Sequence, residues 1–361
     1  MNHKERLLTA INHEEPDRVP LCAWYTPEAE KALLRHLGVE SDQSMMYTDV
    51  GGPLPILMDH DFLISWVGPC TGYYAHPAEE YTDEWGIGWK WFKNAAGGSY
   101  TEMVRRPLQD IVDPSEFSMP DFTAEDRYAG ARRLVAQYGH EYGIMGGCAC
   151  TLFELAWYLR GMEKVLMDMV TNKEFMNAYL DKLVTWVDEA GTRMVGLGVD
   201  IIWIGDDFGA QDHMLISPQL FREFFKPRYA QLFSKWKAIN PQVKIAFHSD
   251  GSIYPIIPDL IEVGLDILNP VQPKSMDPAR LKKEYGNHLT FWGTVDIQEV
   301  LPFGTPADVA NEVKLRLRTV GKGGGLIISP AHNIQPEVSL QNVLAFYETA
   351  KTYGRYPIRD Q

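Results

Sequence analysis

From about residue 130 onwards, the chain alternates long amphipathic stretches with short runs of apolar and β-branched residues. In the copies at 195–207 and 261–272, the amphipathic stretch ends at a glycine, Gly198 or Gly264, and the apolar run follows. This pattern predicts a helix, its C-cap and then a buried strand. Helices that alternate with apolar strands indicate a parallel sheet covered by helices. Further strand-like runs lie at 142–150, 243–250, 288–296 and 325–333.

Two earlier runs, at 18–25 and more weakly at 60–68, bring the predicted strands to eight. Residues 73–119 are rich in Tyr, Trp and Gly, and the segment DEWGIGWKWF within them predicts an inserted, aromatic-rich β-hairpin. We therefore expect a single (β/α)8 TIM barrel over residues 1–361, with an N-terminal helix and this hairpin. An open Rossmann-type sheet is the alternative, but no G-x-G-x-x-G follows a predicted strand.

Composition and charge narrow the class of protein. Hydrophobic residues make up 45% of the chain and charged residues 23%, which is typical of a soluble globular protein with a large core. The first twenty residues carry charges throughout, so we expect a cytoplasmic protein without a signal peptide or membrane helix. The net charge of −14 disfavours nucleic acid and anionic membranes, so the expected partner is a small-molecule substrate or a protein that tolerates an acidic surface. Four cysteines are too few for a disulfide framework, so we expect free thiols.

Polar residues follow many of the predicted strands, at the end where parallel barrels carry their chemistry. His248 and Asp250 are two apart on an extended segment, so their side chains point the same way. With His332, near the end of the last predicted strand, they would give one metal ion two imidazoles and a carboxylate, as at catalytic zinc sites. The alternative is a buried His248 hydrogen-bonded to Asp250, because a lone H-x-D is a weak motif.

Carboxylates at strand ends are candidates for proton transfer, because acids held close together raise one another's pKa. Asp206 and Asp207 follow the run at 201–205, where we expect one to face the barrel mouth and the other to cap the next helix. Glu154 either reaches the site or only complements a helix dipole. The hairpin aromatics either form a lid or cover the barrel wall. The candidate catalytic residues are Asp207, His248 and Asp296, and the candidate substrate-binding residues are Tyr25, Glu154, Trp203, Asp206, Gln272, Trp292 and Asn333.

Longer motifs make nearly the whole chain similar to the uroporphyrinogen decarboxylase-like superfamily. This superfamily includes the haem-pathway decarboxylase and corrinoid-dependent methyltransferases, and the resemblance implies a (β/α)8 barrel. The motifs are PDRVP at 16–20, GDDFG at 205–209, HSDG at 248–251, DILNPVQ at 266–272, GTVD at 293–296, GGG at 323–325 and HNIQP at 332–336.

The methyltransferase branch of this superfamily holds zinc with an H-x-C motif and a later cysteine. Here His248, Asp250 and His332 occupy the corresponding places, so N and O ligands replace both sulfurs and make a harder site. The resemblance implies that zinc polarises the leaving group of a small methylated substrate, such as a methyl ether, phenol or amine. A corrinoid on a partner protein would then accept the methyl group. Barrels of this kind often pair, which makes a homodimer one expected assembly.

The decarboxylase is the alternative activity, with Asp207 or Asp296 as its acid–base group. It needs a basic loop after the first strand to bind a substrate with many carboxylates. Residues 23–30 contain no arginine and include Glu28 and Glu30, so we rank this carboxy-lyase second. A non-catalytic binding protein is a third class, because a fold does not fix a function.

Overall fold

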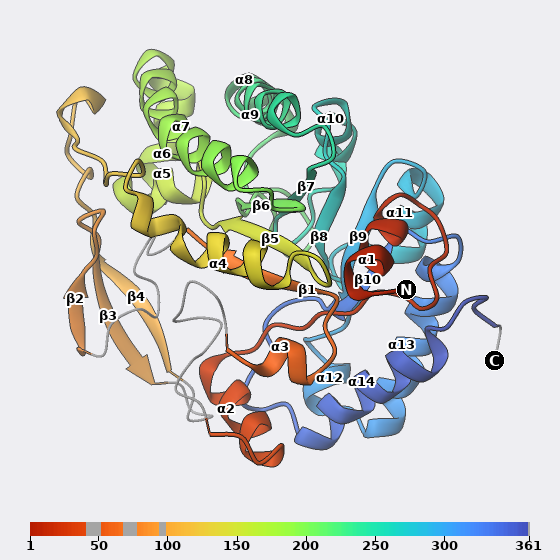
Figure 1. Ribbon diagram of the computed structural model, residues 1–361. Helices are drawn as coiled ribbons and strands as arrows, with labels where there is room; N and C mark the ends of the chain where they lie inside the picture. Colours follow the sequence, from red (N-terminus) through yellow and green to blue (C-terminus); the bar gives the residue numbers. More distant parts are fainter. Residues whose placement is uncertain (41–51, 68–77, 94–98, 360–361) are drawn as a thin grey trace.

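The computed structural model describes residues 1–40, 52–67, 78–93 and 99–359. Its centre is a curled, seven-stranded parallel sheet in the order β1-β5-β6-β7-β8-β9-β10 (Figure 1). All six strands predicted after residue 130 and the weaker candidate at 60–68 are present, although Gly68 lies outside the described residues. The strands are β1 (Phe62–Trp66), β5 (Gly143–Cys148), β6 (Ile201–Gly205), β7 (Lys244–His248), β8 (Ile267–Val271), β9 (Thr290–Val295) and β10 (Leu326–Pro330).

The predicted first strand, at 18–25, closes the barrel as an extended segment with isolated bridges. Leu21 pairs in parallel with Ile328 of β10, and Tyr25 pairs in parallel with Ile334. On the other side, the amide of Asp61, directly before β1, donates to the carbonyl of Leu21 at 3.1 Å. The eight predicted segments therefore surround one core, and the expected α/β barrel is confirmed.

Helices follow the strands and cover the outside of the sheet (Figure 1). The predicted glycine caps are confirmed by backbone angles of φ 91° at Gly198 and 100° at Gly264. At Gly264 two amides close the helix end, Gly264 N to the Ile261 carbonyl and Leu265 N to the Leu260 carbonyl. The helices are α1 (His3–Ile11), α2 (Pro27–His36), α3 (Leu54–Leu57), α4 (Ala129–Tyr138), α5 (Phe153–Arg160), α6 (Met162–Thr171), α7 (Lys173–Gly196), α8 (Pro218–Phe224), α9 (Lys226–Ile239), α10 (Ile257–Glu262), α11 (Pro278–Tyr285), α12 (Val300–Phe303), α13 (Pro306–Arg316) and α14 (Leu340–Tyr353), with shorter turns at Pro114–Glu116, Glu125–Tyr128, Tyr254–Ile256 and Leu317–Gly321.

Side chains fill the barrel interior, and α1 packs into its N-terminal end. Leu7 and Ile11 of α1 belong to the same buried cluster as inward-facing residues of every strand. Inward positions alternate along each strand, so Ile201 and Trp203 of β6 both belong to this cluster. A packed interior leaves the chemistry to the strand ends.

Aspartates at the N-terminal ends of three strands fix the alignment of neighbouring strands. Each one directly precedes a strand and accepts a hydrogen bond from a backbone amide of the strand beside it. A carboxylate in this position pairs an amide at the barrel end that the sheet leaves without a carbonyl. The pairs are Asp61 with Leu21 N at 2.8 Å, Asp200 with Ile144 N at 2.9 Å and Asp266 with Ile245 N at 2.8 Å.

The PDRVP motif contributes to an ion network at this same end of the barrel. Asp61 is fully buried and accepts hydrogen bonds from Arg6 at 2.8 Å and from Arg18 at 2.6 Å. Arg6 also binds Asp17 at 2.6 Å, which ties α1 to the chain that enters the barrel. These charges lie at the end of the barrel opposite the expected site, so the motif serves stability.

The predicted hairpin is part of a three-stranded antiparallel sheet outside the ring of helices (Figure 1). It comprises β2 (Glu80–Thr82), β3 (Gly88–Lys93) and β4 (Ser99–Arg105). Trp85 and Trp89 are buried against the helical wall, with ring centroids 5.7 Å from Trp186 and 5.9 Å from Tyr158. Of the two positions expected for the hairpin aromatics, a lid or the barrel wall, these two tryptophans occupy the barrel wall. The tyrosines at 73 and 74 lie outside the described residues.

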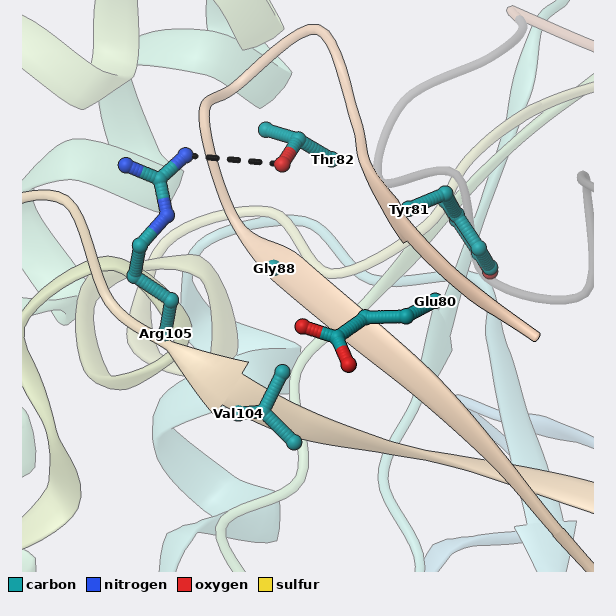
Figure 2. Close-up of a pocket in the computed structure, with 6 residues that line it drawn as sticks. All are labelled: Glu80, Tyr81, Thr82, Gly88, Val104 and Arg105. Carbon is teal, nitrogen blue, oxygen red and sulfur yellow. Dashed lines mark hydrogen bonds between the residues drawn. The ribbon is translucent and has the colours of Figure 1, made fainter. Parts of the chain in front are cut away.

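The outer face of this small sheet has a shallow depression lined by residues of β2, β3 and β4 (Figure 2). Arg105 donates to Thr82 at 3.5 Å across Gly88, as Figure 2 shows. A Cβ at Gly88 would lie 2.8 Å from the Cβ of Arg105, so a side chain there would displace the arginine. The lining includes none of the candidate site residues.

A search of the described helices for a stretch both long and apolar enough to cross a bilayer finds none.

Candidate metal centre

The three predicted metal ligands lie together at the C-terminal end of the barrel. His248 ends β7, Asp250 follows it, and His332 comes just after β10. Their ligand atoms all lie within 4.8 Å of one another, and the two imidazole centroids are 5.9 Å apart. Two ligand atoms bonded at about 2.1 Å to a tetrahedral ion are about 3.4 Å apart, so the widest pair would have to close by up to about 1.4 Å. The donor set and its spacing therefore fit a divalent ion.

Hydrogen bonds fix the orientation of the His248 ring. Asn269 Oδ1 accepts from the indole Nε1 of Trp203 at 3.1 Å, and Asn269 Nδ2 donates to the Trp292 carbonyl at 3.3 Å. Because an indole N–H can only donate, the oxygen of Asn269 must face Trp203 and, at 2.8 Å, His248 Nδ1. His248 Nδ1 therefore carries a hydrogen, and in the neutral imidazole the lone pair lies on Nε2. That nitrogen faces Asp250 Oδ1 at 3.8 Å, so the imidazole is oriented for metal binding.

Neighbouring groups also hold Asp250 in position. Gln272 Nε2 donates to Asp250 Oδ1 at 3.0 Å, while Gln272 Oε1 accepts from the amide of Gly251 at 2.7 Å. Asp250 Oδ2 faces His332 Nε2 at 3.6 Å. Gln272, predicted to bind substrate, thus lies at the site, where the structure shows it bound to a candidate ligand.

Two more carboxyl groups adjoin the three ligands. Asp207 Oδ1 accepts from the amide of Asp250 at 2.7 Å and lies 3.8 Å from His248 Nε2. Burial raises the pKa of Asp207, the imidazole of His248 lowers it, and the charge of Asp250 raises it. Burial, with the charges of Asp207 and Asp206, raises the pKa of Glu154 well above its usual range. This shift favours the protonated form of Glu154, so the structure offers a proton donor beside the candidate ligands.

Asp206 is the helix-capping member of the Asp206–Asp207 pair. It is fully buried and accepts from Thr151 Oγ1 at 2.6 Å, from Leu152 N at 2.7 Å and from Glu154 N at 2.8 Å. It also accepts from the hydroxyl of Tyr229, and burial raises its pKa to about 6. These contacts tie β6 to the start of α5. Protein donors reach both oxygens of Asp206, so the structure gives this residue, predicted to bind substrate, a capping position.

Asp296 also has a structural position. It is buried, and its two oxygens accept from the amide of Gln298 at 2.8 Å and from the amide of Val300 at 3.4 Å. These bonds cap the turn that leads into α12. The predicted acid–base role for Asp296 does not fit a carboxylate bound in this way.

Tyr25 points away from the barrel interior, and the preceding residue, Trp24, points into it. The hydroxyl of Tyr25 bonds to that of Tyr347, which lies 2.7 Å from His60 Nε2. The Trp24 ring lies 6.3 Å from the His248 ring, centroid to centroid. Trp24, and not the predicted Tyr25, is therefore the aromatic residue of this segment that faces the site. Trp24 faces the same way as Cys22, two residues earlier, which belongs to the interior cluster.

Trp203 and Trp292 form the floor of the site and do not open onto it. They are 4% and 1% exposed, and both meet Trp24 edge to face, with centroids 5.7 Å and 5.1 Å away. Trp24 and Trp66 are partly exposed above them. Of these four tryptophans, Trp24 and Trp66 are the ones with exposed surface at the barrel mouth, whereas Trp203 and Trp292, predicted to bind substrate, are buried beneath them. Asn333, also predicted to bind substrate, follows His332 and is partly exposed.

A substrate with many carboxylates would need arginines in the site. Arg160 and Arg228, two buried arginines, lie instead in the helical layer. Arg160 donates to Asp168 at 2.6 Å and to two backbone carbonyls. Arg228 binds Asn177, at 3.1 Å, and Asp181. Both guanidinium groups are thus paired with other elements of the chain.

Comparison with known proteins places the chain in one family. A methylated-thiol--coenzyme M methyltransferase from Methanosarcina mazei is 24% identical over 202 residues, which span 55% of this chain and half of that relative. A uroporphyrinogen decarboxylase from Legionella pneumophila is 25% identical over 274 residues, 74% of each chain. A solved methyltransferase structure from M. mazei shares the fold, with a TM-score of 0.71, 20% identity, and coverage of 97% of this chain and 98% of that one. The Uroporphyrinogen decarboxylase (URO-D) family model matches residues 95–353, and the chain therefore belongs to the URO-D family.

Proposed function

We propose that the protein is a methyltransferase component that moves a methyl group from a small methylated compound to a corrinoid carried by a partner protein. The observation that carries this proposal is the free His248 Nε2, which converges with Asp250 and His332 at the barrel mouth. Zinc bound there would supply a Lewis acid to the leaving heteroatom of a methyl ether, phenol or amine.

The chain's own residues have distinct roles in this scheme. Trp24 and Trp66 pack against the apolar part of the substrate and exclude water from it. Asn269 and Gln272 keep the imidazole of His248 and the carboxylate of Asp250 in place. Glu154 and Asp207, whose pKa values are raised, hold a proton near the leaving atom. That proton neutralises the oxygen or nitrogen left behind when its bond to the methyl carbon breaks.

A decarboxylase is the second candidate function. It is favoured by one observation, namely that the match to uroporphyrinogen decarboxylases spans 74% of each chain. Against it, the described part of the site carries three carboxyl groups, Glu154, Asp207 and Asp250, and those that are ionised repel a substrate with many carboxylates. Methyl transfer therefore ranks first.

Replacement of His248 by alanine, beside Asp207→Asn, separates the two functions. Each protein is assayed for methyl transfer from methylated phenols and amines to a reduced corrinoid protein, and for uroporphyrinogen turnover. We expect His248→Ala to abolish methyl transfer and to lower the zinc content from about one equivalent, while the barrel stays folded because a strand-end residue does not serve its packing.

The matched control is His213→Ala, which removes an exposed histidine paired with Asp212 and should leave activity and zinc content unchanged. Methyl transfer that survives in His248→Ala would refute the proposed role of the metal. Uroporphyrinogen turnover by the wild type, with a greater loss in Asp207→Asn than in His248→Ala, would reverse the ranking of the two functions.

A further inference from the structure

Two polar atoms at the barrel mouth have no partner in the described part of the chain. They are the indole Nε1 of Trp24 and the amide Oδ1 of Asn333, and both are shielded from solvent. Trp24 Nε1 can only donate a hydrogen bond, and Asn333 Oδ1 can only accept one. A folded protein normally pairs buried groups of this kind, so an unpaired donor and an unpaired acceptor at a candidate site indicate a ligand.

The backbone places these two side chains next to each other. Tyr25 and Ile334 form a parallel bridge, in which Ile334 N donates to the Trp24 carbonyl at 2.8 Å and Thr26 N donates to the Ile334 carbonyl at 3.0 Å. Trp24 and Asn333 each precede a member of this bridge, so they are opposite one another. Paired residues point to the same face of a sheet. For Trp24 that face is the barrel interior, where its ring adjoins the ring of His248.

We propose that Trp24 and Asn333 together recognise a hydroxyl group on the substrate, so that the enzyme selects small hydroxylated aromatic methyl compounds. A hydroxyl oxygen accepts from the indole N–H while its own hydrogen is donated to the amide oxygen. A carboxylate offers only acceptors, and Asp207 and Asp250 repel it. A quaternary ammonium offers neither a donor nor an acceptor. This inference rests on the proposed function, whose substrate class it narrows.

An interaction within the protein competes with this assignment. The Trp24 ring meets Trp203 and Trp292 edge to face, and an indole N–H directed at a ring face gains a weak hydrogen bond. That contact would satisfy Trp24 but not Asn333. The two explanations differ in their consequences, because only recognition of a hydroxyl makes both side chains decide which ligand binds.

Ligand binding tests the pair without methyl transfer. Calorimetric titration of the purified holoprotein compares 2-methoxyphenol with methoxybenzene, which lacks the hydroxyl group, and with the trimethylanilinium cation. We expect the wild type to bind 2-methoxyphenol roughly tenfold more tightly than methoxybenzene, as one or two net hydrogen bonds imply. Trp24→Phe and Asn333→Leu should each reduce this ratio to about threefold or less.

Tyr25→Phe is the matched control, because it removes a hydroxyl from the neighbouring residue that points away from the site, and it should leave the ratio unchanged. Thermal unfolding checks that each variant folds. If one of the two variants does not fold, the affinity ratio of the other is sufficient for the test. Equal affinities in the wild type, tighter binding of the cation, no binding, or an unchanged ratio in a folded variant would each overturn the proposal. Selective binding of 2-methoxyphenol without methyl transfer would refute the proposed function but would still support hydroxyl recognition by Trp24 and Asn333.

Discussion

Asn269 is the residue through which the site can be perturbed without touching a metal ligand. Asn269→Leu keeps the volume of the side chain nearly unchanged and removes its polar atoms. The Nδ1–H of His248 and the Nε1–H of Trp203 both lose their acceptor, and the Trp292 carbonyl loses its donor. With Nδ1 unpaired, the ring of His248 is free to turn or to move its proton to Nε2, which cannot then bind a metal.

The size of the effect follows from these contacts. Each buried donor left without a partner costs about 1–3 kcal/mol, so the two donors should lower the free energy of unfolding by about 2–6 kcal/mol. Loss of the partner that orients a metal-binding histidine lowers metal affinity by about 10- to 100-fold. Asn269→Asp keeps an oxygen that accepts from both rings, so it should retain most of the affinity.

Zinc affinity, measured by competition with a chromophoric chelator, and urea unfolding together give the two quantities. Asn342→Leu is a control of the same kind, because Asn342 is a buried asparagine that donates to Leu301 and Gly304 carbonyls, both at 2.8 Å, in the α12 region. That variant should lose stability but no metal affinity. Wild-type zinc affinity in Asn269→Leu, or an equal loss in Asn269→Asp, would show that the tautomer argument for His248 is wrong.

Two predictions concern other parts of the chain. Asp61→Asn removes the charge shared by Arg6 and Arg18 and should lower the free energy of unfolding in urea by about 3–5 kcal/mol; a loss no larger than that of half-exposed Asp17→Asn would contradict this. Burial raises the pKa of Asp83 to about 6, so the folded state binds more protons than the unfolded state between about pH 4 and 6, and stability falls as the pH rises through that range. In Asp83→Asn, the fall in unfolding free energy from pH 5 to pH 7 should be smaller than in the wild type by on the order of 1 kcal/mol. An unchanged fall would refute the raised pKa of Asp83.

The strands and the placement of His248 beside Asp250 could be predicted from the sequence because each depends on a local pattern. Apolar runs after glycine caps gave the strands, and the two-residue spacing of His248 and Asp250 put both side chains on one side of the chain. The choice between adjacent residues was harder. Tyr25 and Trp24 are both aromatic, and the irregular segment that carries them gives no alternating run from which to read the inward face.

The roles of the acidic residues depended on partners distant in the sequence. Asp206 is a cap because Thr151, Leu152 and Glu154, which follow a different strand, present their donors to it. The sequence around Asp206 and Asp207 predicted that one would face the barrel mouth and the other would cap a helix, but it did not show which residue would do which. Asn269 was visible as a strand-end amide, yet its importance appears only where Trp203 and His248 share its oxygen.

The aspartates that precede β1, β6 and β8 give the barrel a modular construction. Each one joins two neighbouring strands into a pair: the extended segment at 18–25 with β1, β5 with β6, and β7 with β8. Within a pair, the carboxylate fixes the strand alignment from the end opposite the site. A circular permutation that opens the chain between pairs, such as between β6 and β7, would keep every pair continuous in sequence. Recombination of barrel halves at the same boundary would preserve strand alignment while exchanging the loops that decide specificity.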